Sequence, residues 1–176
     1  MVAMGYSQVE GVTYFETFAP TASATFNRLV AAMACKLDWD LRHLDVDQAF
    51  IQSELDTDIY LPLPPGCGSV SSKVVILPPG CGSVSGKVVI LPPGCGSVSG
   101  KVVILNKALY GLKQSGRPWY QLLSSTLTEC GFEQCLVDLC VFRLIVAGDV
   151  VAMMGFHVEE IKIAATEKVT EVVASA

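Results

Sequence analysis

The spacing of apolar residues along the chain predicts two amphipathic helices. Over residues 23–37, apolar positions recur every three or four residues after a candidate N-cap, Thr21 or Ser23, which is the period of a helix with one buried face. These positions are Phe26, Leu29, Val30, Met33 and Leu37. A second helix begins at Pro118, a favourable first-turn residue, and ends at Gly131. Its apolar positions are Trp119, Leu122, Leu123, Leu127 and Cys130.

Alternating apolar and polar residues predict four strands. Residues 40–50 alternate loosely and are expected to form a strand that carries carboxylates on one face. The residues on that face are Leu41, His43, Asp45 and Asp47. Residues 140–146 and 150–158 are expected to form a hairpin, and residues 161–164 a short strand after it. The pattern therefore predicts an α+β fold in which an antiparallel sheet packs against two helices that cover one of its faces.

Two neighbouring acids, Glu159 and Glu160, lie at the reversal between the last two predicted strands. Desolvating adjacent carboxylates without a counter-charge is costly. The pair is therefore expected either to face water or to bind a cation, and the residues alone leave both alternatives open.

Residues 64–105 consist of three consecutive units of fourteen residues. The first reads PPGCGSVSSKVVIL and the next two read PPGCGSVSGKVVIL, so they differ only at Ser72 against Gly86 and Gly100. Each unit combines a Pro-Pro-Gly turn with a Lys-Val-Val-Ile-Leu strand, which predicts a small meander or looped excursions. Near-identity indicates a recent duplication inserted in a loop, because surface loops tolerate added length. A functional repeat array is the alternative.

Composition indicates a folded chain without a membrane span. The 176 residues are 51% apolar and 16% charged, with a mean hydropathy of +0.48. The longest apolar stretch, 136–158, is interrupted by Asp138, Arg143 and Asp149, which argues against a spanning helix. The first residues lack the cationic start and apolar core of a secretory signal, so a cytoplasmic or nuclear location is expected.

The balance of charge limits a nucleic-acid role to a local surface. Twelve Lys and Arg against seventeen Asp and Glu give a net charge of −5, the wrong sign for a free-standing module that grips phosphates. One stretch differs, since residues 106–120 hold Lys107, Lys113 and Arg117 without an acid and with Tyr110, Trp119 and Tyr120 interleaved. Of these aromatics, Trp119 and Tyr120 are expected in the core.

The seven cysteines are best interpreted as small buried hydrophobes, and they lack the spacing of zinc ligands.

Four segments, in order, resemble the reverse transcriptase domain of copia-type retrotransposons: QVEGVTYFETFAP, LDVDQAF, LNKALYGLKQSGRPWY and FHVEE. The resemblance runs to about Ala165, apart from the extra repeat copies. It implies part of a right-hand polymerase that copies RNA into DNA with two magnesium or manganese ions. The implied partners are an RNA/DNA template-primer and deoxynucleotide triphosphates. The implied division is partial fingers and the first palm strand in 1–63, the repeats in 64–105, and the remaining palm in 106–176.

The resemblance also implies roles for individual residues. Asp45 corresponds to a metal ligand on the first palm strand, and Glu159 and Glu160 correspond to the other two ligands. Phe50 corresponds to the aromatic residue that screens out the ribose 2′-hydroxyl. Residues expected to line the nucleotide and template pocket are Lys113, Gln114 and Arg117.

Two departures from the family pattern predict a weak or inactive enzyme. Glu159 and Glu160 stand where the family has aspartates, and each extra methylene moves a carboxylate by about one ångström, whereas magnesium requires near-octahedral ligands at about 2.0–2.1 Å. The chain is also expected to lack the thumb and RNase H portions of a parent polyprotein. The alternatives are a non-catalytic binding or structural protein that uses the repeats as an interaction surface, or a transposon relic.

Overall fold

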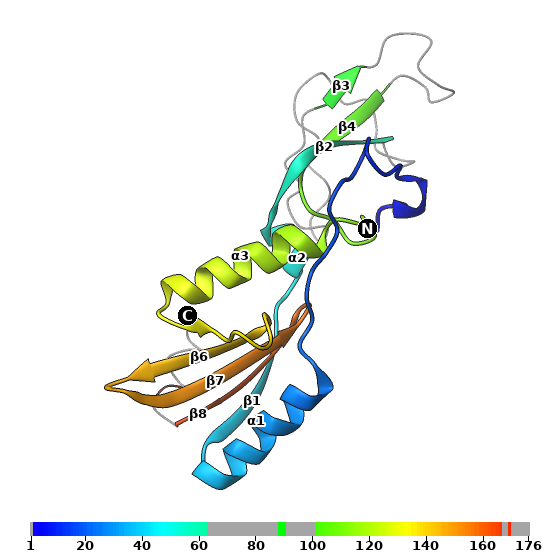
Figure 1. Cartoon of the computed structure of the whole chain (residues 1–176). Helices are drawn as coiled ribbons and strands as arrows, with labels where there is room; N and C mark the ends of the chain where they lie inside the picture. Colours follow the sequence, from blue (N-terminus) through cyan, green and yellow to red (C-terminus); the bar gives the residue numbers. More distant parts are fainter. Residues whose placement is uncertain (1, 63–87, 91–100, 167–168, 170–176) are drawn as a thin grey trace. The chain divides into compact units, whose positions relative to one another are not determined.

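The computed structural model describes residues 2–62, 88–90, 101–166 and 169 (Figure 1). The chain forms two compact units, each made of two separated stretches of sequence. One, the three-stranded unit, comprises residues 1–18 and 50–119, and the other, the five-stranded unit, comprises residues 19–49 and 120–176. The predicted domain boundaries, after residues 63 and 105, were set by the ends of the repeat. The two units of the structure are instead defined by which residues contact one another.

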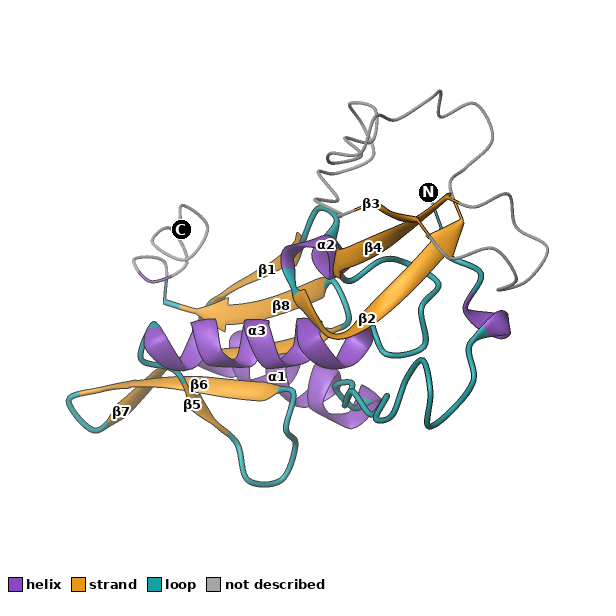
Figure 2. Ribbon diagram, turned by 90° about the horizontal axis from the view of Figure 1, so that it is seen from above, coloured by secondary structure: helices purple, strands orange, loops and turns teal. Residues whose placement is uncertain are grey.

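The five-stranded unit is an antiparallel sheet with strand order β1-β8-β7-β6-β5. Its strands are β1 (Asp40–Asp45), β5 (Glu133–Gln134), β6 (Val141–Val146), β7 (Asp149–His157) and β8 (Glu160–Ala165). Its helices are α1 (Ala24–Leu37) and the later part of α3 (Gly116–Glu129), shown with the strands in Figure 2. The predicted α+β class, with an antiparallel sheet, is confirmed.

Both helices begin and end close to the predicted residues. Ser23 caps α1, because its Oγ accepts a hydrogen bond from Phe26 N at 3.1 Å. Helix α3 begins at Gly116, two residues before Pro118, and the chain leaves it through Gly131, whose φ of +88° suits glycine. The local capping residues therefore carried enough information to place both helices.

The two helices pack on opposite faces of β7, whereas the pattern predicted that they share one face. Successive side chains of a strand point to opposite faces. The Cβ position of Gly155 faces the Phe26 ring of α1, while the neighbouring Phe156 contacts Tyr120 of α3 with a centroid distance of 5.9 Å and ring planes tilted by 43°. The prediction of a single covered face was wrong because each helix shows only its own apolar stripe and not the face on which it packs. Fully buried side chains of this unit include Phe142, Met154, Phe156, Ile163, Val30 and Cys140.

The strand predicted over residues 40–50 is shorter than expected. β1 ends at Asp45, and its partner β8 begins at Glu160 directly opposite. Beyond that pair one further hydrogen bond joins Val46 N to Glu159 O, and the chain then turns through Gln48, at φ 55°, into the short helix α2 (Ala49–Gln52). Asp47 therefore lies in a turn and not on the predicted strand face.

The three-stranded unit has strand order β2-β4-β3, with both pairs antiparallel. Its strands are β2 (Glu54–Pro62), β3 (Val88–Ile90) and β4 (Lys101–Lys107). β3 and the start of β4 come from the Lys-Val-Val-Ile-Leu segments of the second and third repeat units, while the first unit and the Pro-Pro-Gly turns lie outside the described residues. A cluster of apolar side chains, Ala3, Ile59, Leu105, Leu109 and Leu112, forms its core. The unit also contains the short helix η1 (Gly5–Ser7), which comes before β2 in the chain.

Within the described part of the chain, every helix is too short or too polar to cross a membrane.

Candidate active site

The predicted catalytic acids of the first strand and of the acidic turn meet in the five-stranded unit. Asp45 of β1 pairs with Glu160 of β8 in the antiparallel register. One residue further on, Val46 N donates a hydrogen bond to Glu159 O at 3.0 Å, which closes the ladder. Residues directly opposite in such a pair point to the same face, with Cβ atoms about 4.5–5.5 Å apart. The fold therefore brings together two carboxylates that are far apart in sequence.

The acidic turn itself is tight. β7 ends at His157 and β8 begins at Glu160, so Val158 and Glu159 alone make the reversal. Val158 has a φ of 59°, a conformation that β-branched residues rarely adopt. Positive φ is typical of the two-residue turns whose twist matches that of the flanking strands. Glu159 is half-buried and Glu160 is exposed, so the two acids have different surroundings.

His43 is a neighbour of the acids whose contact sequence analysis did not find. It precedes Asp45 by two residues on β1, and its Nε2 lies 3.6 Å from Glu160 Oε2. Both side chains are about half exposed, at 55% and 50%. Alternation had placed His43 on the face of Asp45, but only the pairing of β1 with β8 reveals its contact with Glu160.

The donor chemistry of this site suits a hard divalent cation, but a three-ligand centre is not assembled. Carboxylate oxygens are the ligands that magnesium and manganese prefer. Across the described residues, however, no three His, Cys, Asp or Glu groups lie close enough together to hold a metal ion. Asp45 and Glu160 share a face, while Glu159 lies in the turn. The expectation of two bound ions stays a prediction.

The remaining predicted site residues lie in the three-stranded unit. Gln114 is 2% exposed, and its amide contacts protein on both sides. Its Oε1 accepts a hydrogen bond from Gln8 Nε2 at 2.9 Å, and its Nε2 donates to Thr13 O at 3.2 Å. Gln114 thus ties the segment around Gln8 and Thr13 to the GLKQ block.

The two predicted phosphate-binding cations contact the same N-terminal segment. Lys113 Nζ lies 3.3 Å from Tyr14 Oη and 4.8 Å from the centre of the Tyr14 ring. Arg117 Nη2 lies 2.6 Å from Glu16 Oε2. Sequence analysis missed both partners, because they are about a hundred residues away and no local pattern links them to the basic stretch.

Phe50 packs against Tyr110, with ring centroids 4.6 Å apart and an interplanar angle of 51°. Next to Tyr110, Gly111 has a φ of +93° and touches the backbone of Ala3, so a side chain there would overlap Ala3 O. Ala3 N also donates to Tyr110 O at 2.7 Å. The glycine of the GLKQ block is therefore required by the close approach of the N-terminal segment.

Comparison with known proteins identifies the family. The family model described as "Reverse transcriptase (RNA-dependent DNA polymerase)" matches residues 1–78 and 82–173. The chain belongs to the reverse transcriptase family. The resemblance to copia-type retrotransposons is confirmed by its similarity to Pol polyproteins of plant transposons.

Three relatives of this reverse transcriptase chain illustrate the similarity. It is 32% identical over 93% of its length to the retrovirus-related Pol polyprotein from transposon RE1 of Arabidopsis thaliana, covering 9% of that protein. It is 31% identical over 96% of its length to the RE2 polyprotein of the same plant, covering 10%. It is 28% identical over 81% of its length to the TNT 1-94 polyprotein of Nicotiana tabacum, covering 9%. The chain thus spans about a tenth of the length of these relatives, and no solved structure matches it.

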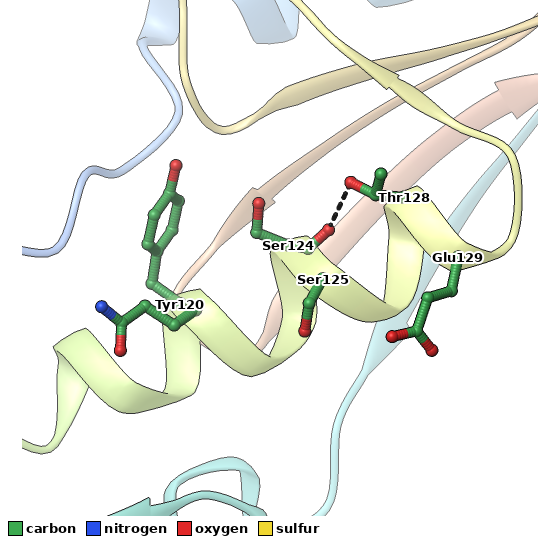
Figure 3. A pocket seen from close by; sticks show the side chains of 6 residues that line it. Tyr120, Ser124, Ser125, Thr128 and Glu129 are labelled. Atoms are coloured by element: carbon green, nitrogen blue, oxygen red, sulfur yellow. Dashed lines mark hydrogen bonds between the residues drawn. The ribbon is translucent and has the colours of Figure 1, made fainter. Parts of the chain in front are cut away.

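A shallow hollow on α3 of this reverse transcriptase chain is lined by none of the predicted site residues (Figure 3). It is lined by Tyr120, Gln121, Ser124, Ser125, Thr128 and Glu129. Two of its hydroxyls are engaged within the helix, since Ser125 Oγ donates to Leu122 O and Thr128 Oγ1 donates to Ser124 O, both at 2.9 Å. These hydroxyl donors are therefore directed at the helix itself and not into the hollow.

Trp119, at 5% exposure, is buried as predicted, and Tyr120 is half-buried.

Proposed function

We propose that the chain is part of a retrotransposon reverse transcriptase whose reaction, RNA-directed DNA polymerisation, is weak or lost in this sequence. The observation that supports this proposal most directly is the pairing of Asp45 with Glu160 beside the acidic turn. Polymerases that transfer nucleotidyl groups use carboxylates from neighbouring strands at one such position. Membership of the family supports the reaction type, and this pair of acids supports the proposed location of the reaction.

In this proposal, Asp45 and Glu160, which share a face, would hold magnesium or manganese, and Glu159 would complete the ligand set from the turn. Bound divalent ions supply stabilisation of the negative charge that develops during phosphoryl transfer. The carboxylates of the chain provide hard oxygen ligands on one edge of the five-stranded unit. That unit then corresponds to part of a polymerase palm, and the three-stranded unit to part of the fingers.

Two features of the acidic edge support weak activity. Glutamates at 159 and 160 reach one methylene further than the aspartates of the family pattern. His43 lies 3.6 Å from Glu160 Oε2 and competes for that carboxylate. A displacement of about one ångström in a catalytic group can lower a rate about 100-fold.

The substrates proposed are an RNA/DNA template-primer and deoxynucleotide triphosphates. Lys113 and Arg117 supply phosphate-binding cations, and the Phe50 ring, supported by Tyr110, screens the sugar. Gln114 contributes through the hydrogen bonds that hold the GLKQ block in place. The alternative from the sequence is a non-catalytic protein. Such a protein would have the same folded core, but its function would not depend on Asp45, Glu159 and Glu160.

Primer extension on an RNA template tests this function. The chain is compared with its Glu159→Asp, Glu160→Asp double variant in magnesium and in manganese, with Asp45→Asn added to the double variant as a control. We expect the double variant to extend the primer faster than the parent, and Asp45→Asn to abolish the gain. Equal rates in parent and double variant would refute the proposed impairment. If neither the parent nor the double variant extends the primer, the proposed polymerase function is refuted and the non-catalytic alternative is left.

A further inference from the structure

The segment of residues 8–16, here called the N-terminal strap, is anchored to the basic stretch by uncharged hydrogen bonds. Gln8 Oε1 accepts from Lys113 N at 2.8 Å, and Gln8 Nε2 donates to Gln114 Oε1 at 2.9 Å. Gln114 Nε2 in turn donates to Thr13 O at 3.2 Å. The two bonds made by the Gln114 amide are partly buried, the bond from Lys113 N is exposed, and all three join neutral groups. The strap therefore stays in place whether or not its charged contacts are made.

The strap has its own internal order. Gly11 N donates to Tyr14 O at 2.9 Å, and the Thr13 hydroxyl accepts from Val9 N at 2.8 Å. The turn formed by these bonds directs the residues after Thr13 toward the basic stretch, where Tyr14 meets Lys113 and Glu16 meets Arg117. An anchored, locally ordered segment can hold a carboxylate near a cation at little entropic cost.

The Glu16 carboxylate binds the Arg117 guanidinium in the way that a phosphate would. A guanidinium binds carboxylate and phosphate oxygens through the same planar set of donors. The 2.6 Å contact between Arg117 Nη2 and Glu16 Oε2 is therefore a contact that a nucleic-acid phosphate would also make. The Glu16 side chain is 70% exposed, against 31% for Arg117, so the acid can leave into water while the arginine stays in place. Exposed ion pairs of this kind are weak and exchangeable.

We propose that Glu16 is a built-in competitor that withholds Arg117 from nucleic-acid phosphates and so weakens the binding of single strands to the basic stretch. The inference rests on the nucleic-acid binding of the proposed function, and it adds regulation by the chain itself. The anchoring bonds keep the competitor close, and the exposure of Glu16 keeps it displaceable.

The test is the binding of a fluorescein-labelled single-stranded RNA oligonucleotide, followed by anisotropy. Three chains are compared: the parent, Glu16→Gln and Glu10→Gln. Each substitution removes one negative charge from the same strap and raises the net charge of −5 by one unit, but Glu16 is the acid that pairs with Arg117 in the described structure. Glu10 is exposed and serves as the matched control for general electrostatics.

We expect Glu16→Gln to bind about three-fold more tightly than Glu10→Gln at low salt, within the range of an exposed ion pair. Between about 50 and 200 mM salt, its log affinity should fall more steeply with log salt, by about 0.7 in slope, because Arg117 gains one phosphate contact. Adding Arg117→Gln to Glu16→Gln should remove both effects.

The outcomes separate the inference from the proposed function. If Glu16→Gln and Glu10→Gln bind alike while the parent also binds, the competitor role is overturned and nucleic-acid binding stands. If none of the three chains binds RNA, both proposals are overturned. Binding by Glu16→Gln alone would support the competitor role most strongly. Circular dichroism of each chain verifies that the exposed substitutions leave the fold unchanged.

Discussion

Asp45 of β1 lies directly opposite Glu160 of β8, so two acidic side chains share one face of the sheet at the end of their ladder. Like charges in directly opposite positions destabilise a sheet. Residues selected for stability alone would not form such a pair. Under the proposed function a cation would offset this repulsion, and in the described structure Glu160 also has His43 Nε2 at 3.6 Å.

Substituting Asp45 by Asn should raise the unfolding temperature in metal-free buffer, because the repulsion with Glu160 is removed. Asp47→Asn is the control, since Asp47 is an exposed acid in the adjacent turn. Thermal unfolding is then repeated in manganese chloride. The parent should gain stability from the cation and Asp45→Asn should gain less, because a ligand that binds the folded state stabilises it. An equal gain in both chains would contradict the role of Asp45.

Replacing Gly155 by Ala should destabilise the five-stranded unit. A Cβ at this position would overlap the ring of Phe26, which is 6% exposed and has little room to move. Overpacking of this kind costs about 1–3 kcal/mol. Urea unfolding of Gly155→Ala, Phe26→Leu and the double variant measures the coupling. The double variant should be more stable than the sum of the single losses, and simple additivity would show that the two residues do not meet.

Asp138 joins the start of α1 to the loop before β6. Its Oδ2 accepts from Ser23 N at 3.1 Å and its Oδ1 accepts from Cys140 N at 3.0 Å. Asp138→Ala should lower the free energy of unfolding by about 1–3 kcal/mol, because two backbone donors lose their acceptor. Asp149→Ala, which changes an exposed acid at the start of β7, is the control and should cost less. Equal losses in denaturant unfolding would argue against the bridge.

Cys140 should resist alkylation in the folded chain. Burial, with a smaller contribution from the Asp138 carboxylate, raises the pKa of its thiol to about 12 from an ordinary 9.0. Iodoacetamide at mildly alkaline pH, followed by peptide mapping, should modify the exposed Cys35 and Cys130 before Cys140. Rapid modification of Cys140 in the folded chain would contradict its burial.

The same thiol predicts how stability depends on pH. Because the folded pKa of Cys140 lies above its ordinary value, the unfolded chain loses this proton first as the pH rises. The contribution of Cys140 to stability is therefore complete below about pH 9 and declines from there toward pH 12. Comparing urea unfolding of the parent and Cys140→Ala across this range isolates the effect. A parallel decline in both chains would assign it to other groups.

Local pattern placed the elements of the five-stranded unit well. The period of the apolar residues together with the Ser23 cap located α1, and the turn residues 147–149 located the hairpin of β6 and β7. The strand β2 was not foreseen, because residues 54–62 combine acids with apolar residues and do not alternate cleanly between the two. The strand predicted over residues 40–50 is longer than the observed β1, because the end of β1 depends on where its partner β8 begins.

The sequence by itself determined the α+β class, the two helices and the β6–β7 hairpin, because each depends on residues near one another along the chain. It also indicated the reverse transcriptase family, because the order of four short motifs along the chain can be compared without a structure. Only the tertiary structure decided that Asp45 faces Glu160, that the helices pack on opposite faces of β7, and that Glu16 pairs with Arg117. These relationships join residues from distant parts of the sequence. Their partners are selected by strand register and packing, on which local periodicity carries no information.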